Sequence, residues 1–233
     1  MTGARPVPLH LPRQRVVPFP DPRPYDHEGL LAFGGDLSVA RLQLAYRSGV
    51  FPWYGEGLVP LWWSPDPRGV IDPTRLHVPR RLQRVLRAGA FTLTWNQCFR
   101  VVMEECGRQR AEGTWVLPEM VTAYTALHAA GGAHSLEVWH DAALVGGVYG
   151  VQVGALFAAE SMFHRRTDMS KVALVALVRS LAQAGVELFD VQFVTPHLQR
   201  LGAQPLPRTT YLDRLLQLRD RQVDLRAPEL RVD

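Results

Sequence analysis

The stretch HSLEVWHDAALVGGVYGVQVGALFAAESMFH, residues 134–164, decides how this chain is expected to fold. It contains three strand-like runs of mostly apolar residues. Turn residues separate the runs, first from His140 to Ala142 and then at Gly154. Because short turns join antiparallel neighbours, the stretch predicts a meander of three antiparallel strands.

The elements around the meander complete the expected fold. The segment from Ser170 to Ala184 is apolar almost all round, which predicts a buried helix. The apolar run from Leu188 to Val194 predicts a further buried strand, which can lie parallel to its neighbour because a helix connects them. Upstream, the pattern predicts a strand at residues 91–96 and two helices, at residues 97–108 and from Pro118 onward. This order indicates an α+β protein with a mixed, mostly antiparallel sheet, and it resembles the GNAT type of acyltransferase fold.

A change of pattern near residue 67 divides the chain into two expected domains, residues 1–66 and residues 67–233. Prolines at 18, 20, 22 and 24 exclude a helix there, and residues up to about 37 are expected to be irregular. Ser38 can cap a short helix that ends at Gly49. Aromatic residues without periodicity, among prolines and glycines at residues 50–70, predict a loop-rich unit.

Composition restricts the class of protein. The 233 residues are 47% apolar and carry a formal charge of +4, with Lys171 as the single lysine among 26 basic residues. A small basic excess permits a polyanionic partner without requiring one. Cys98 and Cys106 are expected about 12 Å apart along one helix, too far for a disulfide. Without a signal-like apolar N-terminus or an apolar run of membrane-spanning length, a cytoplasmic protein with no membrane partner is expected.

Three polar side chains stand in apolar strand segments. Asp190 and Gln192 share one face of their predicted strand, opposite Phe189, Val191 and Phe193. A buried polar group without a partner costs about 2–7 kcal/mol, so this pair is either satisfied internally or faces a ligand. Glu160 can be a structural hydrogen-bond partner. Together the three polar side chains could instead form an acid-lined site for an amine or a cation.

Other segments have two interpretations each. Trp53 and Trp115 either anchor their loops or stack on a planar ligand such as a base. A basic cluster is either a solvated helix face or a phosphate-binding surface; it comprises Arg75, Arg80, Arg81, Arg84 and Arg87. The turn HRRTDMSK, residues 164–171, has no glycine, so its backbone cannot approach a diphosphate closely. This argues against coenzyme A as the acyl donor.

Long motifs along the chain resemble those of the leucyl/phenylalanyl-tRNA–protein transferases. They are GLLAFGGDLS, AYRSGVFPWY, WWSPDPRGV, GTWV, AHSLEVW, LVGGVYGV, ESMFHRRTDMSK and FDVQFVTPHLQRLGA, and they run in order from about Gly29 to Tyr211. That family moves leucine or phenylalanine from tRNA to the α-amine of proteins that begin with Arg or Lys, and the products enter N-degron proteolysis. The resemblance implies a GNAT-like catalytic domain, no cofactor, no metal, Leu-tRNA and Phe-tRNA as partners, and a monomer.

The resemblance also implies roles for individual residues. Asp190, Gln192 and Glu160 match catalytic positions, and Trp53, Trp115 and Tyr46 match positions around the 3′-terminal adenosine. The implied pocket for the donor side chain consists of Val148, Phe157, Met162, Leu174, Leu177, Leu181 and Phe189. An apolar pocket favours leucine, phenylalanine and methionine, and their order of preference stays open. The five arginines would hold the acceptor stem through its phosphates.

Two further questions stay open. The proton of the attacking amine goes either to the Gln192 carbonyl, polarised by Asp190, or to a ribose hydroxyl of the tRNA. Two other functions compete with aminoacyl transfer. A coenzyme A-dependent N-acetyltransferase could have the same fold, and a non-catalytic tRNA-binding module would keep the arginines and tryptophans without needing Asp190 beside Gln192.

Overall fold

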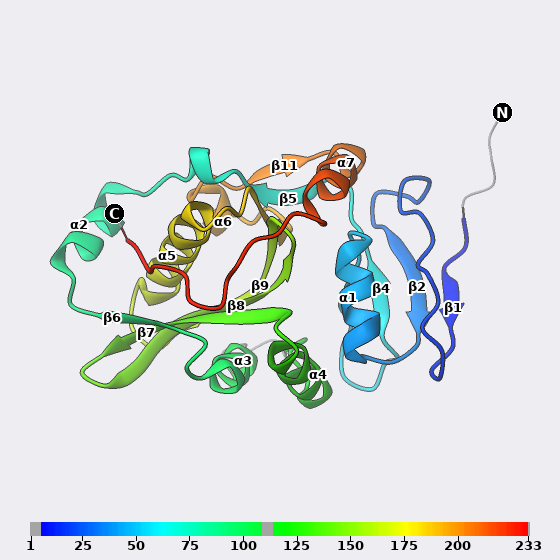
Figure 1. Cartoon of the computed structure of the whole chain (residues 1–233), viewed down its shortest axis with the longest axis horizontal. Helices are drawn as coiled ribbons and strands as arrows, with labels where there is room; N and C mark the ends of the chain where they lie inside the picture. Colours follow the sequence, from blue (N-terminus) through cyan, green and yellow to red (C-terminus); the bar gives the residue numbers. More distant parts are fainter. Residues whose placement is uncertain (1–5, 109–113, 233) are drawn as a thin grey trace.

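A computed structural model describes residues 6–108 and 114–232 of the chain, and it contains two β-sheets (Figure 1). The smaller sheet has the strand order β1-β2-β4-β3. Its elements are β1 (Leu9–Leu11), β2 (Leu30–Gly34), α1 (Val39–Arg47), β3 (Phe51–Pro52) and β4 (Leu61–Trp63). Helix α1 begins as expected after Ser38, whose hydroxyl accepts a hydrogen bond from the Arg41 N–H.

The expectation of an irregular N-terminal region and a loop-rich aromatic segment is wrong, because both regions contribute strands to this sheet. These strands have two to five residues, too few for an alternating pattern to stand out. The prolines at 18–24 lie between β1 and β2, where no sheet hydrogen bond is needed. Trp62 is fully buried in the sheet, and its indole N–H donates to the Gly34 carbonyl.

The larger sheet has the order β11-β5-β10-β9-β8-β7-β6. Its strands are β5 (Arg68–Ile71), β6 (Thr92–Trp95), β7 (Ala133–His140), β8 (Ala143–Val153), β9 (Leu156–His164), β10 (Leu188–Gln192) and β11 (Gln204–Leu206). The predicted meander is confirmed as β7, β8 and β9, which pair antiparallel. Its turns lie where expected, at Asp141–Ala142 and at Gly154, and all three residues have positive φ.

Helices cover both faces of the larger sheet (Figure 1). Helix α5 (Met169–Gln183) packs on one face, and α2 (Arg80–Ala88) packs against α5. Helices α3 (Phe99–Arg108) and α4 (Pro118–Ala129) pack on the other face. The buried, apolar character of α5 is confirmed, since its leucines and valines lie in the core. None of the helices in the described part of the chain is long and apolar enough to cross a membrane.

The connection through α5 makes β10 parallel to β9, as predicted, while the other pairs of the larger sheet are antiparallel. This arrangement is the expected α+β fold with a mixed, mostly antiparallel sheet. Strand β5 was not predicted, since it is four residues long and follows a proline-rich segment. It pairs with both β10 and β11, and so places Arg68 and Gly69 beside the end of β10.

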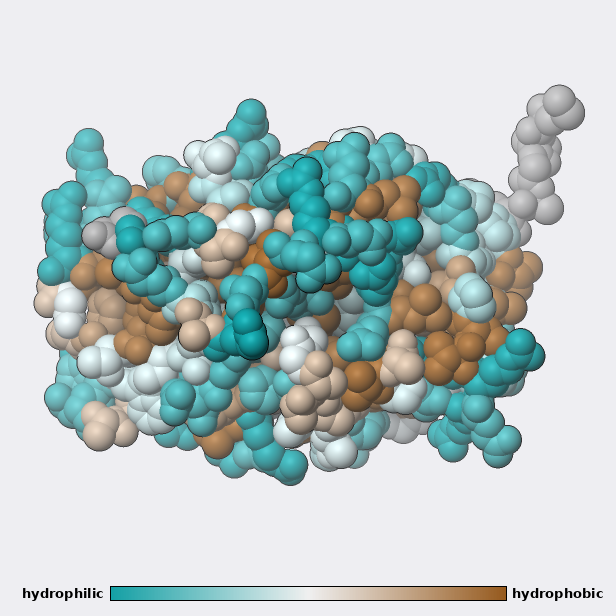
Figure 2. Space-filling view, in the orientation of Figure 1, coloured by the Kyte–Doolittle hydropathy of each residue, from teal (hydrophilic) through white to brown (hydrophobic). Residues whose placement is uncertain are grey.

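The C-terminal region joins the two sheets. A short helix, α6 (Pro196–Gln199), follows β10, and helix α7 (Arg208–Leu218) follows β11. The buried guanidinium of Arg208 donates to the carbonyls of Asp26 and Ser64, at 2.9 and 2.7 Å. On the face seen in Figure 2, mostly hydrophilic residues cover the region of α7, while apolar residues gather over the smaller sheet.

Candidate active site

A cavity of about 340 Å³ opens where the parallel strands β9 and β10 separate. The two strands pair only from Leu188 opposite Leu156 to Asp190 opposite Ala158. Beyond that point both contribute to the walls of the cavity. Its lining residues are Phe51, Pro52, Trp53, Trp115, Glu160, Ser161, Met162, Val191, Gln192, Phe193, Thr195 and Leu198. The cavity therefore lies where the predicted parallel pairing of β9 and β10 ends.

Strand β10 ends in an unusual turn at Gln192. This residue has a φ of 55°, in the left-handed region that non-glycine residues rarely adopt. The Phe193 N–H donates to the Val191 carbonyl at 2.6 Å, which closes a three-residue turn around Gln192. The strand was predicted to continue to Val194 with Phe193 buried. Instead the turn leaves Phe193 41% exposed at the rim of the cavity.

The turn brings Gln192 to Glu160, as the sequence suggested. The Gln192 Nε2 donates to the Glu160 Oε1 at 2.9 Å, and the amide carbonyl Oε1 is the acceptor end of the same side chain. Burial and, to a smaller extent, the nearby charge of Asp190 raise the pKa of Glu160, which lies at about 8 once all neighbouring groups have acted. Hydrogen bonds from Tyr46 and Gln192 and the charge of Arg68 act in the opposite direction. Glu160 can therefore gain and lose a proton near neutral pH.

Asp190 does not face the cavity. Its Oδ1 accepts from the Arg68 Nε at 2.8 Å and from the Gln192 backbone N–H at 2.9 Å. Its Oδ2 accepts from the Arg68 Nη2 at 2.6 Å and from the Tyr211 hydroxyl at 2.8 Å. These four bonds use the four acceptor positions of a carboxylate. The bulge between Asp190 and Gln192 separates the two side chains, which an unbroken strand would place on one face.

Sequence reasoning missed Arg68 and Tyr211. Arg68 is 1% exposed, and its guanidinium lies between the rings of Phe51 and Tyr211, 4.6 and 4.7 Å from their centres. Both residues fall within the stretch of resemblance, Arg68 inside the motif WWSPDPRGV. Nothing in that pattern indicates a partner 122 residues away, so the only available signal was a single arginine among apolar residues.

The three residues expected around an adenosine lie at different depths. Trp53 is 43% exposed, stands 5.6 Å from the Phe193 ring, and lines the cavity together with the partly buried Trp115. Tyr46 is buried behind the cavity wall. Its hydroxyl lies 2.6 Å from that of Tyr124 and hydrogen-bonds Glu160. The two tryptophans are available to a ligand, whereas Tyr46 contacts the carboxylate.

Of the seven residues expected to hold the donor side chain, Met162 lines the cavity. The other six are at most 1% exposed in the apolar cluster that includes the buried side of α5: Val148, Phe157, Leu174, Leu177, Leu181 and Phe189. They belong to the apolar core and do not line the cavity. The five arginines expected to meet phosphates are all exposed, one at Arg75 and four on α2. Arg81 also lies 3.6 Å from Asp168.

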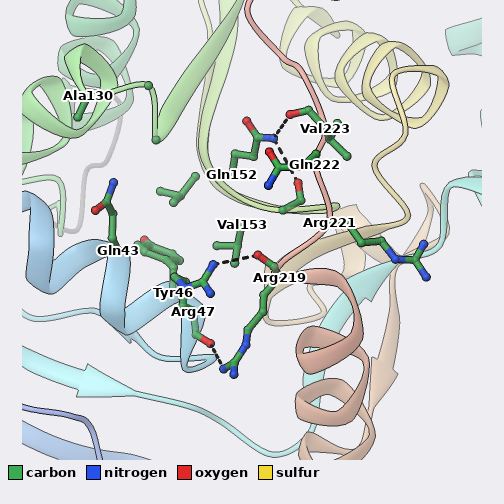
Figure 3. Close-up of a pocket in the computed structure, with 14 residues that line it drawn as sticks. Gln43, Tyr46, Arg47, Ala130, Gln152, Val153, Arg219, Arg221, Gln222 and Val223 are labelled. Atoms are coloured by element: carbon green, nitrogen blue, oxygen red, sulfur yellow. Dashed lines mark hydrogen bonds between the residues drawn. The ribbon is translucent and has the colours of Figure 1, made fainter.

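A second cavity, of about 420 Å³, lies between α1, the end of β8 and the segment after α7 (Figure 3). Two of its arginines hold these elements together. Arg47 donates to the Arg219 carbonyl at 2.9 Å, and Arg219 donates to the Arg47 carbonyl at 3.2 Å. Gln152 donates to the Val223 carbonyl at 2.8 Å. These bonds fasten the C-terminal segment across the molecule, and we assign this cavity no chemistry.

Comparison with known proteins agrees with this architecture. The family model of the leucyl/phenylalanyl-tRNA protein transferase matches residues 70–216, and that of its N-terminal domain matches residues 35–66. Proteins named leucyl/phenylalanyl-tRNA–protein transferase are similar over most of their length. The one from Magnetococcus marinus is 52% identical over 85% of this chain and 87% of its own. The one from Methylococcus capsulatus is 47% identical over 92% of both chains.

Solved structures show weaker similarity. A GCN5-related N-acetyltransferase from Kribbella flavida matches 70% of this chain and 59% of its own at 12% identity and a TM-score of 0.40. A structure described as L-PGS from Bacillus licheniformis matches 72% of this chain and 56% of its own at a TM-score of 0.37. The matched family model covers more than half of the chain, and relatives near 50% identity cover most of it. The chain belongs to the leucyl/phenylalanyl-tRNA–protein transferase family.

Proposed function

We propose that this aminoacyltransferase moves leucine or phenylalanine, and in addition methionine, from tRNA to the N-terminal α-amine of proteins that begin with Arg or Lys. The products would be marked for N-degron proteolysis. The observation that carries the proposal is the Glu160–Gln192 pair in the cavity between β9 and β10. A carboxylate beside an amide carbonyl provides acceptors for the protons of an incoming amine.

The reaction needs a proton acceptor more than a nucleophile on the protein. The α-amine nitrogen attacks the carbonyl carbon of the aminoacyl ester, the peptide C–N bond forms, and the ester C–O bond breaks. The amine loses one proton, and the departing ribose oxygen gains one. Glu160 has a pKa of about 8, close to the roughly 7.7–8.0 of a protein α-amine. Because the two values match, Glu160 in its ionised form can accept the proton without a large energetic penalty.

Gln192 positions the amine. Its Nε2 is bonded to Glu160, which fixes the plane of the amide and leaves the carbonyl end to accept from the amine. Asp190 accepts four hydrogen bonds already, so we assign it no contact with substrate. Glu160 is the acidic side chain in the cavity wall, and its ionised form, which predominates above about pH 8, would attract an acceptor that begins with a basic residue.

The donor side of the proposal rests on aromatic and basic residues. Trp53 and Trp115 line the cavity and offer faces on which the terminal adenosine can stack, a contact that contributes about 1–3 kcal/mol per base. Met162 would meet the leucyl or phenylalanyl side chain. The exposed arginines at residue 75 and on α2 would hold acceptor-stem phosphates, whose recognition is independent of base sequence.

Transfer of radiolabelled leucine from Leu-tRNA to short peptides tests the proposal. Peptides that differ only in their first residue, Arg, Lys or Gly, serve as acceptors, and acetyl-coenzyme A replaces Leu-tRNA in a parallel reaction. We expect label on the Arg and Lys peptides alone and no acetylation. Equal labelling of the Gly peptide would contradict the acceptor rule, and acetylation would favour the coenzyme A-dependent alternative.

A further inference from the structure

We propose that Arg68 is a positioning residue for aminoacyl transfer, which acts through Asp190 to hold Gln192 in its left-handed turn. The inference rests on the proposed function, since its main readout is transfer of an amino acid from tRNA. It assigns a role to a buried ion pair that lies beside the cavity without lining it.

The connection from Arg68 to Gln192 consists of hydrogen bonds. Arg68 binds both oxygens of Asp190, and the Asp190 Oδ1 accepts from the Gln192 backbone N–H at 2.9 Å. The Tyr211 hydroxyl completes the set on Oδ2. A two-point guanidinium–carboxylate contact fixes the carboxylate plane as well as its distance. Asp190 therefore presents Oδ1 to the Gln192 N–H in one orientation.

The turn needs this support because it is unfavourable by itself. A glutamine with a φ of 55° in a three-residue turn persists only where its surroundings hold it in place. The turn also sets the function of the residue, since it points the Gln192 side chain to Glu160. If the backbone relaxed to an extended conformation, Gln192 would leave both Glu160 and the cavity.

Arg68 is itself held by parts of the chain far from β10. Its Nη1 donates to the Gly49 carbonyl at 3.2 Å, and the rings of Phe51 and Tyr211 lie on either side of the guanidinium. Gly49 and Phe51 come from the segment after α1. The position of Gln192 thus depends on contacts from that segment and from α7, in addition to those within β10.

Gly69, the next residue of β5, makes room for the turn because it has no side chain. A Cβ atom on Gly69 would lie 2.6 Å from the carbonyl carbon of Phe193 and 2.9 Å from the Val194 nitrogen. Both are backbone atoms of the turn, so a side chain at residue 69 would displace it. A Gly69→Ala substitution therefore moves the turn while every charge and hydrogen-bonding group of the Arg68–Asp190–Tyr211 cluster remains.

Three variants test the proposal in the full-length enzyme. Arg68→Lys keeps the charge but loses the two-point contact. Tyr211→Phe keeps the ring that packs on Arg68 but loses the hydrogen bond from its hydroxyl to Asp190. Gly69→Ala places a methyl group against the backbone of the turn. The matched control is Gly55→Ala, because Gly55 has ordinary φ and open space around it. Single-turnover transfer from Leu-tRNA to an Arg-starting peptide is measured as a function of tRNA concentration and pH, and melting temperature is measured alongside.

We expect the rate at saturating tRNA to fall about tenfold or more in Arg68→Lys and Gly69→Ala, and less in Tyr211→Phe, with KM for tRNA within about threefold of wild type. In Gly69→Ala the midpoint of the pH profile should rise, because a displaced Gln192 no longer donates the hydrogen bond that lowers the pKa of Glu160. Tyr211→Phe should show a smaller rise. Gly55→Ala should behave as wild type.

The opposing interpretation is that the ion pair only fastens β5 to β10. It predicts that the variants melt at lower temperatures but transfer leucine at the wild-type rate when tRNA is saturating and the temperature is below the melting range. Wild-type rates in both Tyr211→Phe and Gly69→Ala would overturn the proposal. Tyr211→Phe and Gly69→Ala keep the ion pair, so the test survives if Arg68→Lys does not fold. Failure of wild-type enzyme to transfer leucine would instead contradict the proposed function.

Discussion

The guanidinium of Arg68 holds both oxygens of Asp190, with Nε 2.8 Å from Oδ1 and Nη2 2.6 Å from Oδ2, although the two residues are 122 positions apart. With Tyr211 and the Gln192 N–H on the same carboxylate, Asp190 has no acceptor position left for a substrate. In our assignment Glu160 accepts the proton, Gln192 orients the amine, and Asp190 supports Gln192.

Replacement of Glu160 by glutamine should slow transfer. In the wild type we expect the single-turnover rate to rise with pH and level off above about 8, because the ionised form of Glu160 accepts the proton. Glu160→Gln should lower the plateau by about 10²–10⁴-fold and abolish the rise attributed to this group. A variant that kept the wild-type plateau would show that another group, such as a tRNA hydroxyl, takes the proton; the plateau decides, because the acceptor amine also titrates near pH 8.

The same residue should make stability depend on pH. Folding raises the pKa of Glu160 from 4.5 to about 8, so between these values the folded protein keeps a proton that the unfolded chain has lost. The contribution of this group to the free energy of unfolding is therefore complete at low pH and is lost as pH rises through about 8. Urea denaturation at several pH values should show this decline in the wild type and a flatter curve in Glu160→Gln. Glu104→Gln, on the surface of α3, should retain the decline.

Loss of the Trp53 ring should weaken tRNA binding with little effect on folding. The side chain is 43% exposed and packs on the rings of Trp63 and Phe193, so Trp53→Ala should lower the melting temperature modestly and leave the protein folded at the assay temperature. If the terminal adenosine stacks on this ring, Kd for Leu-tRNA should rise by roughly 5- to 150-fold, the equivalent of 1–3 kcal/mol. Phe33→Ala, at an exposed aromatic residue of β2, is the matched control. Unchanged affinity in Trp53→Ala would mean that the ring only shields its loop.

The arginines of α2 should contribute salt-dependent affinity. The double variant Arg84→Ala/Arg87→Ala should bind tRNA more weakly. The slope of the logarithm of the association constant against the logarithm of salt concentration should become less steep by up to about 2, since each phosphate contact contributes about 0.7–0.9 to its magnitude. Arg100→Ala removes an exposed arginine from α3, on the opposite face of the sheet, and should change neither quantity. Equal effects of the double variant and Arg100→Ala would indicate a general charge effect rather than a binding surface on α2.

Two apolar residues separate packing from donor recognition. Leu177 is fully buried on α5, so Leu177→Ala should cost about 2–5 kcal/mol of unfolding free energy. Met162 is partly buried in the cavity wall, so Met162→Ala should mainly change the ratio of leucine to phenylalanine transfer. Competition between Leu-tRNA and Phe-tRNA gives that ratio, and urea denaturation gives the stability. A changed ratio in Leu177→Ala with normal stability would place the donor pocket deeper than the cavity seen here.

Much of the larger sheet could be predicted from sequence because its strands are long. Strands β7, β8 and β9 have eight or more residues, enough for strand-like runs and the turn residues between them to define both extent and direction. The short strands of the smaller sheet, and β5, could not be predicted. Two to five residues carry too little pattern, and their stability comes from partners elsewhere in the chain.

The sequence by itself was sufficient to single out Glu160, Gln192, Trp53 and Trp115, and all four line one cavity, whereas Asp190, Tyr46 and most of the expected donor-pocket residues do not. Tertiary structure alone decided what each can do. The separation of Asp190 from Gln192 depends on a bulge, and the bulge depends on Arg68, Gly69 and Tyr211, which come from β5 and α7. Local pattern records which residues are apolar or polar, whereas hydrogen bonding and pKa depend on distances between residues far apart in the chain. That is why the buried arginine beside Asp190 was found only in the folded molecule.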